Sequence, residues 1–186
     1  MIRRPTGPCR WVLGPVVLAI ALVPLGAGAN VFHGLDEIHD LAFPGASRVQ
    51  GHDYFLDPSQ QAAIERRTGI PIDSRLVTVY VGYLGDQVQG YAILDTHLVR
   101  TFPETFLVVL HADGSVRSTY VMAFHEPLEY LPHEGWLRGL NGRRLDDDLR
   151  IGRAVAGITG ATLSSHAVLT GLRRALAIYE TLIAEN

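Results

Sequence analysis

The stretch ETFLVVLHADGSVRSTYVMAF, residues 104–124, decides the fold because it contains two strand-like runs joined by a turn. Both runs are rich in β-branched and aromatic residues, and the Asp113-Gly114 pair between them is typical of a hairpin. Two similar runs precede this stretch, at residues 75–84 and 87–95. Because the connections are short, we expect an antiparallel sheet. The run at 75–84 is too apolar to alternate cleanly, which indicates a strand covered on both faces.

Two segments before these runs have the pattern of helices. In residues 33–47, apolar residues recur at helical spacing until a Pro-Gly pair ends the pattern. Residues 57–71 begin with Asp57 as a helix N-cap and Pro58 in the first turn, and Gly69 ends the helix. The sequence therefore places two short helices ahead of most of the sheet.

A longer helix is expected at the C-terminus, from Leu163 to residue 185. One stripe of this helix is apolar and should pack on the sheet. Gly171 interrupts an otherwise favourable helix sequence, which indicates a close contact at that position. Residues 125–153 are polar and irregular. The predicted class is α+β, with a mostly antiparallel sheet packed by helices.

The first 29 residues differ in composition from the rest of the chain. Three arginines precede an apolar run that begins at Trp11, and an Ala-Gly-Ala triplet ending at Ala29 follows it. This order is typical of a secretory signal peptide cleaved after Ala29. The alternative is a retained membrane anchor, because residues 11–29 are long enough to span a bilayer. We expect residues 30–186 to form one exported, periplasmic domain.

Charge and cysteine content exclude several classes of function. Removal of residues 1–29 takes away three arginines and the single cysteine, so the formal charge falls from −3 to −6. A negative domain without cysteine has no disulfide or thiolate chemistry and is a poor partner for nucleic acid. Residues 125–134, HEPLEYLPHE, contain histidines and glutamates but match no standard metal-ligand spacing. We therefore expect no metal site.

The candidate ligand site is the stretch ITGATLSS, residues 158–165, directly before the last helix. Thr162 lies where this helix begins, and the first turn of a helix presents unpaired N–H groups that favour phosphate. Gly160 tolerates a positive φ, and Ala161 adds little bulk, so a ligand can approach the backbone closely. The alternative is a threonine that serves only as the helix N-cap.

The stretch ITGATLSS also resembles the [ST]-G-A-T-x-[ST] motif of the FMN-binding domain family. This family includes the peripheral flavin subunits of Rnf-type and sodium-translocating NADH:quinone oxidoreductase complexes, and related small extracytoplasmic flavoproteins. Further resemblance lies in FPGAS (43–47), DGSV (113–116), AFHEPL (123–128) and WLRGLNGR (136–143). It therefore covers most of the chain after residue 35. It implies an FMN-binding domain whose C-terminal helix starts at the cofactor attachment motif.

In this family a flavin transferase attaches FMN through a phosphoester to the last threonine of the motif, which is Thr162 here. The resemblance implies that Thr159, Gly160, Ala161, Leu163 and Ser164 border the phosphate or ribityl chain. It further implies that His125 and Glu126 border the flavin ring, the alternative being a purely structural pair. Trp136 is a candidate to stack on the ring, the alternative being core packing. The family's transferase signature has an aspartate where this sequence has Ala156.

These expectations describe an extracytoplasmic electron-transfer protein that carries FMN and needs no catalytic acid or base. Its partners would be a membrane electron-transport complex or an extracytoplasmic redox carrier, together with the flavin transferase. One alternative is a protein that binds FMN or another phosphate ligand reversibly, or a scaffold without a redox role. Another is a hydrolase built on Ser164 or Ser165. The sequence argues against it, because Ser165 and His166 are helix neighbours that do not face each other.

Overall fold

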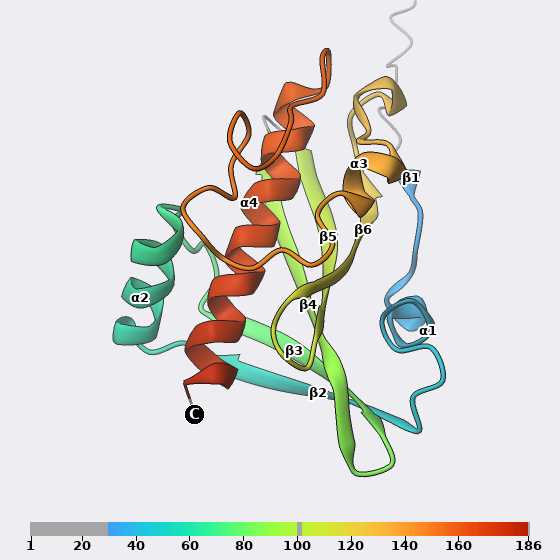
Figure 1. The fold of residues 1–186 in the computed structure, drawn as a ribbon, viewed down its shortest axis with the longest axis vertical. Coiled ribbons are helices and arrows are strands. Elements are labelled where there is room, and N and C mark those ends of the chain that lie inside the picture. Colours follow the sequence, from blue (N-terminus) through green and yellow to red (C-terminus); the bar gives the residue numbers. More distant parts are fainter. Residues whose placement is uncertain (1–29, 100–101, 186) are drawn as a thin grey trace, which may run out of the picture.

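The computed structural model describes residues 30–99 and 102–185. At its centre is an antiparallel sheet of six strands in the order β1-β6-β5-β4-β3-β2 (Figure 1). The strands are β1 (Asn30–Val31), β2 (Arg48–Phe55), β3 (Leu76–Leu84), β4 (Gln87–Val99), β5 (Phe102–His111) and β6 (Val116–Phe124). The predicted α+β class is confirmed, and the four predicted strands form β3 to β6.

The two edge strands were not predicted from the sequence. Strand β2 pairs antiparallel with β3 along its whole length, from Arg48 to Phe55. Most of its residues are exposed, and only Val49 and Tyr54 are half-buried. Strand β1 is two residues long and pairs with the end of β6. Because edge strands bury little apolar surface, their sequences carry little of the alternation by which a strand is recognised.

The helices lie before, between and after the strands. They are η1 (Leu35–Glu37), α1 (Ile38–Ala42), α2 (Pro58–Thr68), η2 (Leu128–Tyr130), α3 (Glu134–Arg138) and α4 (Thr162–Tyr179), followed by the π-helical turn η3 (Glu180–Ala184). Helix α2 has the predicted N-cap at Asp57 and a left-handed C-cap at Gly69. The expected helix within residues 33–47 is shorter than its pattern suggested. Helix α4 begins at Thr162, where the motif places the start of the helix.

The sheet is covered on both faces, as the apolar run in β3 predicted. On one face α4 packs against alternate residues of the central strands, including Ile93, Val108 and Leu110. On the other face α1 packs against the intervening residues, including Leu107 and Val109. Figure 1 shows α4 and α2 on one side of the sheet and α1 on the other. Because both faces of the sheet are covered by apolar side chains, the residues of β5 are apolar at successive positions and do not alternate with polar ones.

Two glycines allow the close packing of these layers. A Cβ built on Gly171 of α4 would lie 2.9 Å from Asp95 Oδ2 and 3.3 Å from Phe106, which confirms the predicted close contact. A Cβ built on Gly82 of β3 would lie 2.3 Å from the ring of Phe43. Phe43 begins the FPGAS stretch and is 1% exposed. That stretch therefore anchors the chain after α1 to the sheet.

The expected signal peptide or membrane anchor, residues 1–29, lies outside the described residues. Among the residues that the structure describes, no helix is long and apolar enough to cross a membrane.

Candidate site at the start of helix α4

A cavity of about 260 Å³ opens where α4 begins. It is lined by Val99, Glu126, Tyr130, Gly160, Ala161, Thr162, Leu163 and Ser164. The fold therefore brings Glu126, from the segment after β6, to the predicted motif residues 160–164. Thr159, His125 and Trp136 do not line this cavity. Val99 and Tyr130 line it without having been predicted.

The turn before α4 depends on a glycine. The Ala161 N–H donates a hydrogen bond to the Ile158 carbonyl oxygen, 3.1 Å away, which closes a tight turn around Thr159 and Gly160. Gly160 has a φ of 86°, which a residue with a Cβ rarely adopts. Apart from its two chain neighbours, no residue that the structure describes has an atom within 4 Å of the position that a Gly160 Cβ would take. The glycine is therefore required by the backbone, and it leaves the space beside it open.

Helix α4 begins without a capping side chain. Its N-cap residue is Ala161, and no side chain accepts a hydrogen bond there from the first turn. In contrast, Asp57 caps α2 by accepting from the N–H groups of Ser59 and Gln60 at 2.7 and 2.9 Å. The alternative interpretation of the motif as a threonine N-cap is therefore wrong. The first residues of the longest helix of the described chain line the cavity, and the N–H groups of a first helical turn have no partner within the helix.

The hydroxyl groups of the motif have different surroundings. Thr162, at the first position of α4, is exposed. Ser164 is 3% exposed and lines the cavity. Ser165 is fully buried, and its Oγ donates a hydrogen bond to the Ala161 carbonyl oxygen at 2.8 Å. The Ser165 hydroxyl thus stabilises the start of the helix, and Thr162 carries a hydroxyl that a second protein can reach.

The predicted His-Glu pair divides between two environments. Glu126 is half-buried and lines the cavity, where its carboxylate can accept hydrogen bonds from ligand N–H or hydroxyl groups. The ring of His125 stacks on Phe102, with ring centroids 6.3 Å apart and an angle of 6° between the planes. Its Nδ1 is buried and has no hydrogen-bond partner within the described parts of the chain. His125 therefore packs beside Phe102 and does not line the cavity.

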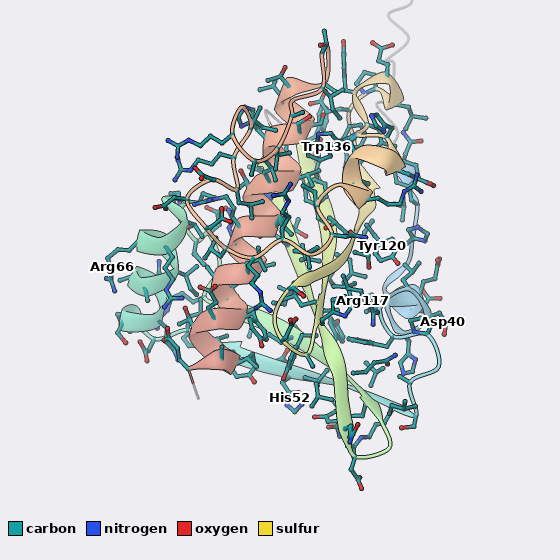
Figure 2. All side chains as sticks on the ribbon, in the orientation of Figure 1. Asp40, His52, Arg66, Arg117, Tyr120 and Trp136 are labelled. Atoms are coloured by element: carbon teal, nitrogen blue, oxygen red, sulfur yellow. The ribbon has the colours of Figure 1, made fainter. Side chains whose placement is uncertain are left out.

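Trp136 holds the segment that leads to the motif. Its Nε1–H donates a hydrogen bond to the Ala156 carbonyl oxygen at 2.7 Å, and its ring packs against the core beneath α4. Figure 2 shows Trp136, a residue of α3, on the side of this helix that faces α4. This position supports the packing alternative for Trp136, because the indole already contacts the protein and does not line the cavity.

A second, more open cavity of about 510 Å³ adjoins the first and shares Val99 and Leu163 with it. His97, His166 and Arg174 also line it. These three residues were not predicted from the sequence. The sequence does contain a signal for His97. Side chains alternate between the two faces of a strand, and this alternation places Asp95, His97 and Val99 of β4 on the face that packs against α4. Charged residues at core-facing positions of a strand indicate a buried polar network.

No group of three His, Cys, Asp or Glu side chains in residues 30–99 and 102–185 could hold a metal ion. Comparison with known proteins adds no family: neither a scan against protein-family models nor a search of curated proteins finds a match to this chain. The function is therefore inferred from the cavity, the open helix terminus and the motif.

Proposed function

We propose that this chain is an extracytoplasmic electron-transfer domain that holds FMN at the start of α4, linked through a phosphoester to Thr162. The observation that carries the proposal is the open N-terminus of α4. A long helix starts with Ala161 as its N-cap, faces a cavity, and displays an exposed threonine hydroxyl at its first position. The same residues form the motif that resembles the covalent FMN site.

The N-terminus of α4 is suited to bind a phosphate group. Its free N–H groups and the positive end of the helix dipole both favour an anion. The dipole contributes only about 0.3–1 kcal/mol, whereas nanomolar retention of a free ligand requires about 12 kcal/mol. A phosphoester to Thr162 removes this requirement. Covalent attachment is useful outside the cytoplasm, where a lost flavin is not readily replaced.

The dimensions and polarity of the site are compatible with the rest of the cofactor. The first cavity, about 260 Å³, is slightly smaller than the usual range for small-molecule sites of about 300–1,000 Å³. The adjoining cavity of about 510 Å³ provides the further room that a three-ring flavin needs. Glu126 supplies a hydrogen-bond acceptor, and Leu163 and Val99 supply apolar surface. The flavin would supply the redox chemistry, and these residues would attach and orient it.

The alanine at position 156 affects the proposed covalent attachment of FMN more than the binding of FMN itself. It is exposed in the segment before the motif, and its carbonyl oxygen is held by Trp136. A flavin transferase can therefore reach this position, although the aspartate of the family's signature is missing. The proposed partners are this transferase and the membrane complex or redox carrier that exchanges electrons with the flavin.

The visible absorbance of the protein tests whether it carries flavin. The full-length chain is exported in a host that has a flavin transferase, purified and extensively desalted. A yellow protein with a flavin spectrum supports the proposal. A colourless protein contradicts it and favours a scaffold without a redox role. Addition of free FMN to a colourless preparation, followed by desalting, tests reversible binding in the same experiment.

A further inference from the structure

A buried ionic network lies beside the cavity, between β4 and α4. Asp95 accepts hydrogen bonds from Arg174 Nη1 at 2.8 Å and from His97 Nδ1 at 2.6 Å. Asp95 is 5% exposed and Arg174 is 7% exposed. Because the ionised carboxylate only accepts hydrogen bonds, the Nδ1 atom of His97 carries a proton. Asp95 thus neutralises Arg174 and fixes the orientation of the His97 ring.

Glu104 faces this network from the neighbouring strand. In the pairing of β4 with β5, Glu104 lies directly opposite His97. Glu104 is completely buried, and neither carboxylate oxygen has a hydrogen-bond partner among the described residues. The same holds for Nε2 of His97. A buried carboxylate with no partner is strongly disfavoured, whereas its protonated form costs much less.

The charge of the network depends on whether Glu104 is protonated. The charges of Asp95 and Arg174 cancel. A protonated Glu104 adds no charge, whereas an ionised Glu104 leaves one buried negative charge without a hydrogen-bond partner among the described residues. A neutral network is the form that burial favours.

We infer that Glu104, opposite His97, is a proton site beside the two cavities, which takes up a proton when negative charge is added there. His97 also lines the adjoining cavity, and Val99, on the same face of β4, lines both cavities. The source of the added charge rests on the proposed function, in which a redox partner delivers an electron to the flavin. The compensating proton comes from solvent: an O–H bond of hydronium breaks and leaves water, the O–H bond of Glu104 forms, and the buffer replaces the proton.

The surrounding charges support this coupling. Burial raises the pKa of Glu104 from its usual value to about 7, while the charge of His97 lowers it and the negative charge of Glu126 raises it. Glu126 lines the first cavity, so a charge placed there acts on Glu104 in the same direction. The titratable or charged groups near the pair are Asp95 on β4, Arg174 and His166 on α4, and His125 and Glu126 after β6.

Infrared spectroscopy of the full-length protein tests the site without relying on flavin. The spectrum is recorded from pH 5 to pH 9 for the wild type, Glu104→Gln and the control Glu129→Gln, whose glutamate is exposed. We expect a protonated carboxyl band at pH 5 that disappears on passing through about pH 7. Glu104→Gln should lack this band, and Glu129→Gln should keep it. If Glu104→Gln removes no carboxyl band at pH 5 or pH 6, the proton site is refuted.

Reduction of a yellow preparation with dithionite at pH 8 tests the coupling. We expect the Glu104 carboxyl band to appear on reduction in the wild type and in Glu129→Gln, but not in Glu104→Gln. A yellow protein in which reduction leaves this band absent contradicts the coupling. A colourless protein contradicts the proposed function instead, and the first measurement still decides whether the proton site exists.

Discussion

The indole Nε1 of Trp136 lies 2.7 Å from the carbonyl oxygen of Ala156 and donates a hydrogen bond to it. This contact joins α3 to the extended segment that precedes the motif. Ala156 is two residues before Ile158, whose carbonyl oxygen accepts the hydrogen bond that closes the turn into α4. Trp136 therefore fixes the backbone that presents Gly160 and Thr162 to the cavity.

Replacement of Trp136 by Phe should loosen the approach to the site while keeping most of the packing. Loss of one hydrogen bond to the Ala156 carbonyl should lower the free energy of unfolding by about 1 kcal/mol. We also expect lower flavin content per protein. Urea unfolding and the ratio of flavin to protein absorbance measure the two effects. Unchanged stability together with unchanged flavin content would show that the contact does not position the motif.

Gly171→Ala should destabilise the protein although alanine is the better helix former. Alanine improves intrinsic helix propensity by about 1 kcal/mol. The new Cβ would lie 2.9 Å from Asp95 Oδ2, however, so either the Asp95 carboxylate must leave its partners His97 and Arg174 or α4 must move away from β4. We expect a net loss of about 1–3 kcal/mol in the free energy of unfolding, as for other overpacked cores. Thr170→Ala is the control in the same helix, and a stabilised Gly171→Ala protein would contradict the close contact.

The folded state should lose stability as the pH rises through the pKa of Glu104. Burial raises this pKa from 4.5 to about 7, so the folded state binds the proton more tightly than the unfolded state does. The stabilisation is complete below pH 4.5 and is lost by about pH 7. The loss amounts to roughly 3 kcal/mol, at 1.36 kcal/mol for each pKa unit.

Glu104→Gln keeps the shape of the protonated side chain and cannot ionise. We therefore expect it to be more stable than the wild type at pH 8, by up to about 3 kcal/mol, and similar to it at pH 5. Urea unfolding at both pH values measures this difference. Parallel pH profiles for the two proteins would mean that Glu104 does not titrate in this range.

Ala161→Ser should separate stability from function. A serine at the N-cap can accept a hydrogen bond from the first turn of α4, as Asp57 does in α2. Such a cap typically adds about 0.5–2 kcal/mol to stability. The same hydrogen bond occupies N–H groups that the proposed phosphate would use, so flavin content should fall. Thermal unfolding and flavin absorbance provide the two readouts, and an increase in both would contradict the phosphate site.

Sequence alone predicted the parts of this fold that bury apolar surface. Strands β3 to β6 and helix α4 carry long apolar patterns, and α2 carries a complete set of capping signals at Asp57, Pro58 and Gly69. Strand β2 was missed because it is mostly exposed and gains its hydrogen bonds from β3, which is distant in the sequence. Pairing between strands is a tertiary property that local pattern does not encode.

The start of α4 and the motif residues beside it could be predicted from the sequence, whereas the buried network next to them could not. The motif residues from Gly160 to Ser164 are contiguous, so their position at a helix start followed from the sequence. The network of Asp95, His97 and Arg174 depends on how α4 packs across β4, a contact that Gly171 allows. In the sequence, the only indication of this network is that charged residues occupy positions of β4 that face α4.

The intact mass of the denatured protein tests the central claim most directly. The wild type, Thr162→Ala and the control Thr159→Ala are exported together with a flavin transferase, and each is measured after unfolding. We predict the added mass of one FMN residue on the wild type and on Thr159→Ala, and no added mass on Thr162→Ala. Absence of that mass from the wild type, or its persistence in Thr162→Ala, would contradict covalent FMN at Thr162.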